Sequence, residues 1–541
     1  MYKGQQVKQG VKAGLSVWLV GGALASCAEF GSETDSAGPI SVPATGGATN
    51  GGSTSEPPFP SPEVELEESF LAPVVSGKYL WTANPETNKI ARVMADTLAI
   101  EVLDAGHGPT YLAALPEGAT EGGALVQNEL SNDVSVFLRD GKTGLLDLDR
   151  IPVQEGASAW AVGDEGHYAI AWSRAADQDG SSGDGFQDLT VLSFDEQSVV
   201  ATKLSVGFRP RRVVINHDES HAYVVSEPGI SVIELGQEPQ VVREIALQAP
   251  GGEAPRDVLF SAGGEVAYVA HEGSDQLLLV STETGEKRSL TLPGSITDLD
   301  RSGDGSLLAA VVREAEGSAG EGGAGGASPG GSSVTLLDAQ ESIDEPMNQR
   351  QLVMDEVVGS VVLSADASRA VLFTNATDST RVILLDIEAR QQRVVDVRAP
   401  ARAAFLSEEG NFGVVLMDRA AGSSQAGGFA LLSLEQDLFP RIEGTKQPVQ
   451  FVSLSAEARR ALLTTEATSS APAQTYFARF PSMQVDQVTL PSRPLASGLV
   501  PDVGRGFVAQ EHPEGRISFF DLESGDSTTL TGFELASKVV R

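Results

Sequence analysis

The sequence predicts an all-β protein, a β-propeller of four-stranded blades, preceded by a disordered tether. Two observations lead to this prediction: a repeat of about 45 residues with four short strand-like segments in each unit, and an almost complete lack of helical periodicity. Repeats of this kind are typical of propeller blades, each of which is one four-stranded sheet. A third observation, the composition of the first 68 residues, sets the N-terminal part apart from the repeats.

Each repeat unit begins with an apolar run that leads into a turn of the type S-x-[DEG]-[GA], followed by three further strand-like runs. The residue at the serine position of this turn marks each unit, and successive markers are 40 to 62 residues apart. The markers are Ser76, Pro116, Gly163, Asn216, Ser261, Ser302, Ser364, Ser407, Ser455 and Pro501. The longest interval contains the insert 314–333, which is rich in glycine and serine and is therefore expected to be flexible.

Ten units exceed the four to eight blades that propellers usually have. The sequence therefore leaves open one large ring, with seven to ten blades expected, or two rings in one chain. The closing segment 532–541 is too short for a blade and could add a strand to the first one.

The units that begin at Pro210 and Pro255 resemble YVTN-type propeller repeats. The matching motifs are AYVV at Ala222, SVIEL at Ser231 and AYVA at Ala267, and SGDG follows at Ser302. The resemblance implies the propeller fold and an exported, often surface-associated role. It implies no single activity, because such propellers serve as lactonases, adhesion modules and scaffolds.

The N-terminus is typical of an exported bacterial lipoprotein. Three lysines precede an apolar stretch at 13–24, and the following Leu24-Ala25-Ser26-Cys27 resembles a lipobox. Cys27 is the only cysteine of the chain, so we expect cleavage before Cys27 and a lipid anchor on it. An ordinary secretory signal is the alternative. By analogy with lipoproteins, Ala28 favours the outer membrane, on its periplasmic face or at the cell surface.

These features divide the chain into a signal peptide at 1–26, the lipidated cysteine with a Gly/Ser/Pro-rich tether at 27–68, and the propeller at 69–541. The net charge of −36 argues against binding of nucleic acid or anionic lipid headgroups. We therefore expect contact with the membrane through the N-terminal lipid only, and protein partners in the envelope or at the surface.

No catalytic set is predicted, because the P-loop and Cys-x-x-Cys-His motifs are missing from the sequence. In a four-stranded blade, the loops before the first strand and between the second and third strands lie on one face. That face is expected to carry the candidate ligand-binding residues, with His167, His217 and His221 on the opposite face. The candidates are His107, Arg209, Arg211, Arg256, His271 and His512.

A calcium ion is the only cofactor that the sequence suggests. The loop 177–188 carries carboxylates in a glycine-rich segment, a composition that suits calcium, and its candidate ligands are Asp177, Asp179, Asp184 and Asp188. Position 5 of this loop is Ser181 and the glycine of a calcium loop at position 6 is missing, so a solvated insertion is the alternative. The segment Asp300–Asp304 matches even less well and coincides with a repeat turn.

The sequence favours a lipid-anchored envelope propeller that acts as a binding or scaffold module without enzymatic activity. The alternative is a lactonase-like or other propeller hydrolase with a small extracytoplasmic substrate, suggested by the YVTN-like repeats and the histidines and arginines of one face. A passive surface-layer component is the third hypothesis.

Overall fold

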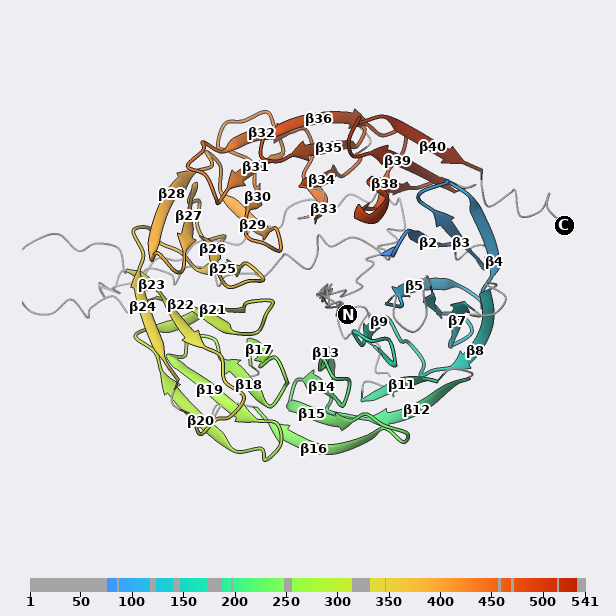
Figure 1. Cartoon of the computed structure of the whole chain (residues 1–541), viewed down its shortest axis with the longest axis horizontal. Coiled ribbons are helices and arrows are strands. Elements are labelled where there is room, and N and C mark those ends of the chain that lie inside the picture. The colour runs from blue at the N-terminus through green and yellow to red at the C-terminus, as the bar shows by residue number, and fades with distance from the viewer. Residues whose placement is uncertain are drawn as a thin grey trace, which may run out of the picture.

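The computed structural model describes residues 75–84, 87–116, 123–139, 146–173, 187–195, 198–247, 255–313, 331–345, 347–455, 459–468, 471–512 and 515–532. Within these ranges, forty strands form ten antiparallel sheets, and each sheet consists of four strands that are consecutive in the chain. Figure 1 shows the ten sheets as the blades of one closed ring around a central opening. The predicted fold class is therefore confirmed, with one blade for each repeat unit.

The strands of each blade run in order from the central opening to the rim. Blade 1 consists of β1 (Val75–Ser76), β2 (Tyr79–Asn84), β3 (Lys89–Met94) and β4 (Ile100–Asp104), and blade 2 consists of β5 (Pro109–Ala114), β6 (Ala124–Asn128), β7 (Asp133–Arg139) and β8 (Leu146–Pro152). Blade 3 consists of β9 (Ala159–Val162), β10 (Tyr168–Trp172), β11 (Asp188–Asp195) and β12 (Ser198–Ser205), and blade 4 consists of β13 (Pro210–Ile215), β14 (His221–Ser226), β15 (Gly229–Glu234) and β16 (Gln240–Ala246). Blade 5 consists of β17 (Asp257–Phe260), β18 (Val266–Ala270), β19 (Gln276–Ser281) and β20 (Lys287–Thr291).

Blade 6 consists of β21 (Ser295–Arg301), β22 (Leu307–Arg313), β23 (Ser332–Asp338) and β24 (Gln349–Val353), and blade 7 consists of β25 (Ser360–Leu363), β26 (Arg369–Phe373), β27 (Arg381–Asp386) and β28 (Gln391–Asp396). Blade 8 consists of β29 (Ala401–Leu406), β30 (Phe412–Met417), β31 (Gly427–Ser433) and β32 (Arg441–Thr445), and blade 9 consists of β33 (Val449–Ser455), β34 (Arg460–Thr465), β35 (Gln474–Arg479) and β36 (Gln484–Thr489). Blade 10 consists of β37 (Pro494–Val500), β38 (Arg505–Gln510), β39 (Arg516–Asp521) and β40 (Ser527–Thr531), and the short 3-10 helix η3 (Pro501–Val503) lies between β37 and β38.

The marker residues of the repeat lie at the turn between the first and second strands of every blade. The hydroxyl of Ser302 shows why a serine recurs there, since it accepts a hydrogen bond at 3.0 Å from the backbone N–H of Leu307, five residues further on. Ser261, Ser364 and Ser407 accept the equivalent bond at 3.0 to 3.2 Å. In blade 4 the side-chain oxygen of Asn216 takes the same place. A short polar side chain thus closes each of these turns.

The second and third strands of the blades are buried on both sides, whereas the fourth strands are largely exposed. All six residues of β30 are buried, while β40 carries only exposed or half-buried residues. Neighbouring blades pack face to face, and apolar clusters such as the one that joins Ala309 of β22 to Leu372 of β26 fill the seams. Strands covered on both faces read as continuous apolar runs, which is the pattern of the repeat.

The ring closes between blade 10 and blade 1 by side-chain packing. Leu80 and Val93 of blade 1 lie in one buried cluster with Phe507 and Phe519 of blade 10. In the described residues, no strand is exchanged between the two blades, since each sheet is built from its own four strands. The closing segment that was expected to add a strand lies outside the described residues beyond Gly532.

Several sequence predictions also concern residues outside the described ranges. They include Cys27, the tether 27–68 and most of the insert 314–333, of which Ser332 and Ser333 are the first residues of β23. Among the described residues, no helix is long and apolar enough to cross a membrane.

Candidate functional site

The ring has two faces, which differ in the loops that they carry. We call the face with the loops before first strands and between second and third strands the mouth face, and the opposite one the turn face. His107, Arg209 and Arg256 lie in loops that lead into β5, β13 and β17, and Arg211 lies in β13. His271 and His512 lie between second and third strands. All six candidates are thus on the mouth face, as the strand order predicts.

The structure brings only some of these candidates together. Arg209 and Arg211 both approach Glu227, with nitrogen-to-oxygen distances of 3.2 and 4.0 Å. Arg256 and His271 belong to the same blade, where Nε2 of His271 lies 2.9 Å from a backbone carbonyl oxygen. His107 and His512 lie in other blades. Ligand binding by these residues stays a prediction.

Bulges occur near the start of several innermost strands, at their ends on the mouth face. In β13, Pro210 pairs with Ser226 and Arg212 with Val225, so Arg211 is an extra residue. A bulge of this kind redirects a side chain out of the regular ladder. The same irregularity recurs in five further blades, where the extra residues are Thr110, Thr297, Arg402, Gln450 and Leu495.

Arg402 lies near the mouth-face end of β29, and it was not among the candidates predicted from the sequence. It lies five residues before the marker Ser407, just as Arg211 and Arg256 lie five residues before Asn216 and Ser261. Counting back from each marker would have identified it.

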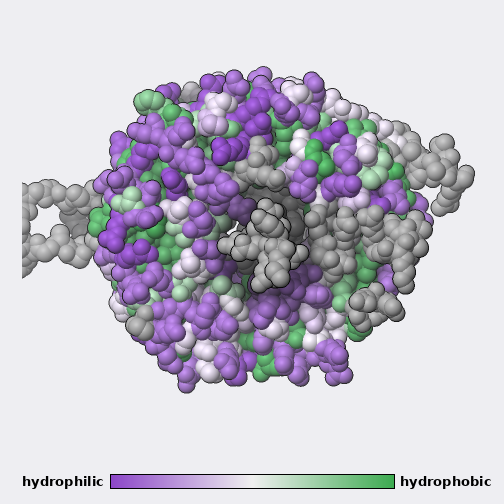
Figure 2. All heavy atoms as spheres, viewed as in Figure 1, coloured by the Kyte–Doolittle hydropathy of each residue, from purple (hydrophilic) through white to green (hydrophobic). Residues whose placement is uncertain are grey.

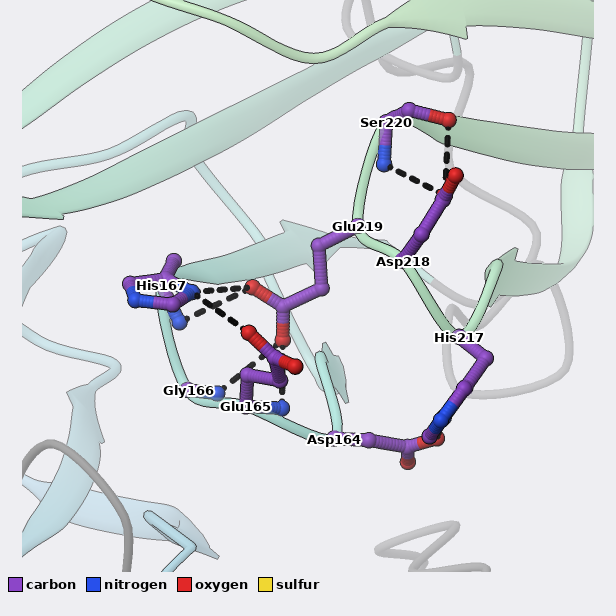
Figure 3. A network of polar contacts seen from close by, with 8 residues as sticks. All are labelled: Asp164, Glu165, Gly166, His167, His217, Asp218, Glu219 and Ser220. Carbon is purple, nitrogen blue, oxygen red and sulfur yellow. Dashed lines mark hydrogen bonds and ion pairs between the residues drawn. The ribbon is translucent and has the colours of Figure 1, made fainter.

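On the turn face, Glu219 joins blade 4 to blade 3 (Figure 3). The residue is only 4% exposed, and its carboxylate accepts hydrogen bonds from the backbone N–H groups of Glu165, Gly166 and His167 at 2.7 to 3.0 Å. Nδ1 of His167 lies 3.2 Å from the same carboxylate. These donors occupy the carboxylate, so its arrangement fits a clamp between blades.

His217 and His221 lie on the turn face as predicted, and they have different partners. Nδ1 of His217 lies 3.1 Å from a carboxylate oxygen of Asp164 in the neighbouring blade, and this contact raises the pKa of His217. Nδ1 of His221 lies 2.9 Å from the hydroxyl of Ser220. The two histidines therefore take part in separate contacts.

The acidic segments considered for calcium are only partly described. Asp177, Asp179 and Asp184 lie outside the described residues, and Asp188 is the exposed first residue of β11. Asp304 accepts hydrogen bonds from Ser302 and Ser306 and so stabilises the turn. Among the described residues, no group of three or more His, Cys, Asp or Glu side chains is placed to hold a metal ion.

A groove lies at the edge of the turn face between blades 8 and 9, and the sequence reasoning missed it. It has a volume of about 640 Å³ and lies between the β31–β32 and β35–β36 loops. Of its lining residues, Phe439 is 94% exposed and Leu438 is 40% exposed, while Met483 is buried. The sequence alone does not indicate this groove, because an apolar residue in a loop can be buried or exposed.

No model of a known protein family matches the sequence, and no curated protein matches it. Three solved structures resemble its fold. Dihydro-heme d1 dehydrogenase NirN in complex with DHE is 11% identical, with 76% of this chain and 75% of that chain covered and a TM-score of 0.43. A eukaryotic initiation factor is 11% identical, with 84% and 96% covered and a TM-score of 0.47. Apo AztD from Citrobacter koseri is 11% identical, with 67% and 93% covered and a TM-score of 0.40. Likeness at this level carries no argument about function.

Proposed function

We propose that this chain is a binding or scaffold module of the bacterial cell envelope, held to a membrane by lipid on Cys27. The groove between blades 8 and 9 is proposed as the surface that binds a protein partner. The observation that carries this proposal is the exposure of Phe439, which is 94% exposed beside the groove.

The composition of the groove supports a protein partner. Its lining combines apolar side chains, among them Leu438, Phe439 and Met483, with the charged residues Arg441 and Asp486. These two form ion pairs with Glu443 and Arg479. Protein interfaces combine apolar and charged side chains in this way, and exposed aromatic anchors contribute much of the binding free energy there. The surface in view in Figure 2 is mainly hydrophilic, with scattered hydrophobic patches.

The anchor is proposed from the sequence at Cys27, which resembles a lipidation site. Several acyl chains on one residue give stable membrane attachment, so the groove would be presented near an envelope membrane. The YVTN-like repeats support an exported role. The lactonase-like alternative stays a hypothesis.

The test is affinity capture of the full chain from envelopes after cross-linking, comparing Phe439→Ser with the matched control Leu130→Ser. Leu130 is also exposed, at 78%, but lies on the mouth face. Phe439→Ser should weaken partner binding by about 2 kcal/mol, as expected for an aromatic anchor, and Leu130→Ser should not. Recovery of the monomer alone from the wild type under several cross-linking conditions would contradict the proposal.

Membrane attachment is tested separately with Cys27→Ala. The variant should lose incorporation of labelled fatty acid and move from the membrane fraction to the soluble fraction. Unchanged labelling would overturn the assignment of Cys27 as the lipidated residue.

A further inference from the structure

An arginine of a fourth strand fastens blade 7 to blade 8 at the turn face. Arg393 of β28 donates hydrogen bonds to the backbone carbonyl oxygens of Leu438 and Gln436, at 3.0 and 3.4 Å. It also forms an ion pair with Asp437 at 2.9 Å. All three partners lie in the loop between the third and fourth strands of blade 8. One guanidinium group thus holds this loop against the preceding blade.

The same contact recurs at two other seams of the ring. Arg243 of β16 in blade 4 donates a hydrogen bond at 3.3 Å to the carbonyl oxygen of Thr284, in the corresponding loop of blade 5. Arg288 of β20 in blade 5 donates to the carbonyl oxygens of Ile343 and Glu345 at 2.8 and 3.0 Å, in the corresponding loop of blade 6. The space between a fourth strand and this loop of the next blade therefore suits a guanidinium group.

At the seam between blades 8 and 9, the arginine of the fourth strand has a different partner. Nε of Arg441 in β32 donates a hydrogen bond at 2.8 Å to a carboxylate oxygen of Glu443 in the same strand. The corresponding loop of blade 9, between β35 and β36, contributes Ser482 and Met483 to the groove. β32 and β36 lie next to each other on the rim in Figure 1. The groove of about 640 Å³ therefore occupies the position that Arg393 fills at the preceding seam.

The surroundings of the groove favour a cationic group in it. The chain has a net charge of −36, which attracts a positively charged partner. Asp486 lines the groove, and its side chain is 53% exposed although it pairs with Arg479. Phe439, which also lines the groove, is 94% exposed. A guanidinium group stacks well on such a ring, as Arg209 does on Phe208 at 5.3 Å from the ring centroid.

We propose that the protein partner of the groove presents an arginine on an extended segment, and that this arginine closes the seam between blades 8 and 9. The inference rests on the proposed function, because it names the chemistry of the partner that the groove binds. The guanidinium group donates to the carbonyl oxygens of Pro481 and Ser482, much as Arg288 donates to two carbonyl oxygens of blade 6. It also pairs with Asp486, and its flat face packs on the ring of Phe439.

Fluorescence anisotropy of the full chain with two labelled peptides tests the inference at low ionic strength. One peptide is GSLRLSG, and the other carries citrulline, the neutral counterpart of arginine, at its centre. The arginine peptide should bind at least about tenfold more tightly, because it alone offers a charged fork.

Variants of the groove test which side chains receive the arginine. Phe439→Ser should weaken binding of the arginine peptide by about tenfold, and Asp486→Asn by about threefold. Asp344→Asn is the matched control, since it removes the same charge from the corresponding loop of blade 6 and should leave binding nearly unchanged. Equal affinity for the two peptides, no binding of the arginine peptide, or equal losses in Asp486→Asn and Asp344→Asn would overturn the inference.

The capture experiment of the proposed function separates the two proposals. An excess of the arginine peptide should displace the captured partner, and the citrulline peptide should not. A partner that is captured through Phe439 but displaced by neither peptide would overturn this inference and leave the proposed function in place. Recovery of the monomer alone contradicts the proposed function itself.

Discussion

The carboxylate of Glu219 fills the space that a side chain at position 163 would need. A Cβ atom added to Gly163 would lie 2.0 Å from Oε1 of Glu219. Gly163 is the marker residue of blade 3, and the missing side chain lets a carboxylate from blade 4 reach the backbone of its turn. The seam between these blades therefore depends on a glycine.

Gly163→Ala is expected to destabilise the protein by about 2 kcal/mol or more, because Glu219 must move away from its backbone donors. Thermal unfolding of the variant and the wild type measures the effect. Gly236→Ala is the control, since nothing lies within 4 Å of a Cβ added there. An unchanged unfolding temperature for Gly163→Ala would contradict the clamp.

The contact between His217 and Asp164 predicts a pH dependence. The hydrogen bond to Asp164 raises the pKa of His217 above its ordinary value of 6.5. Its contribution to stability is therefore complete below the unfolded-state pKa and is lost as the pH rises through the folded-state pKa. An NMR titration of His217 should show a raised pKa that returns towards the ordinary value in Asp164→Asn. The same pKa in both proteins would show that Asp164 is not the cause.

Ser302→Ala should cost about 1 kcal/mol, because the N–H of Leu307 is buried in the turn and loses its acceptor. Ser289→Ala, on the exposed strand β20, is the control and should change little. Chemical denaturation of both variants provides the comparison, and equal midpoints would argue against the role of the marker serine.

Phe507→Ala should weaken the closure of the ring. Phe507 is fully buried in the cluster between blades 10 and 1, and loss of such a side chain costs about 3 to 5 kcal/mol. Hydrogen exchange should rise first in β2 and β3 of blade 1. A uniform rise over all blades would show that the seam has no separate stability.

The sequence predicts the repeat well because the information is local. Ser302 and Asn216 each close a turn by accepting a hydrogen bond from a backbone N–H five residues further on. Such a marker residue can therefore be recognised from a short segment of sequence. For the same reason, the position of Arg402 could have been predicted from its distance to the marker Ser407. Contacts between blades are different, since Glu219 and its partners lie more than 50 residues apart. The exposure of Phe439 depends on the packing of whole blades, and no short motif indicates it.

The central claim, that the groove between blades 8 and 9 binds a protein partner, is tested most directly by photo-cross-linking in intact cells. A photoreactive amino acid replaces Phe439 in one variant and Leu130 in another. The account predicts a discrete cross-linked protein from position 439 and none from position 130. The same products from both positions, or none from position 439, would contradict it.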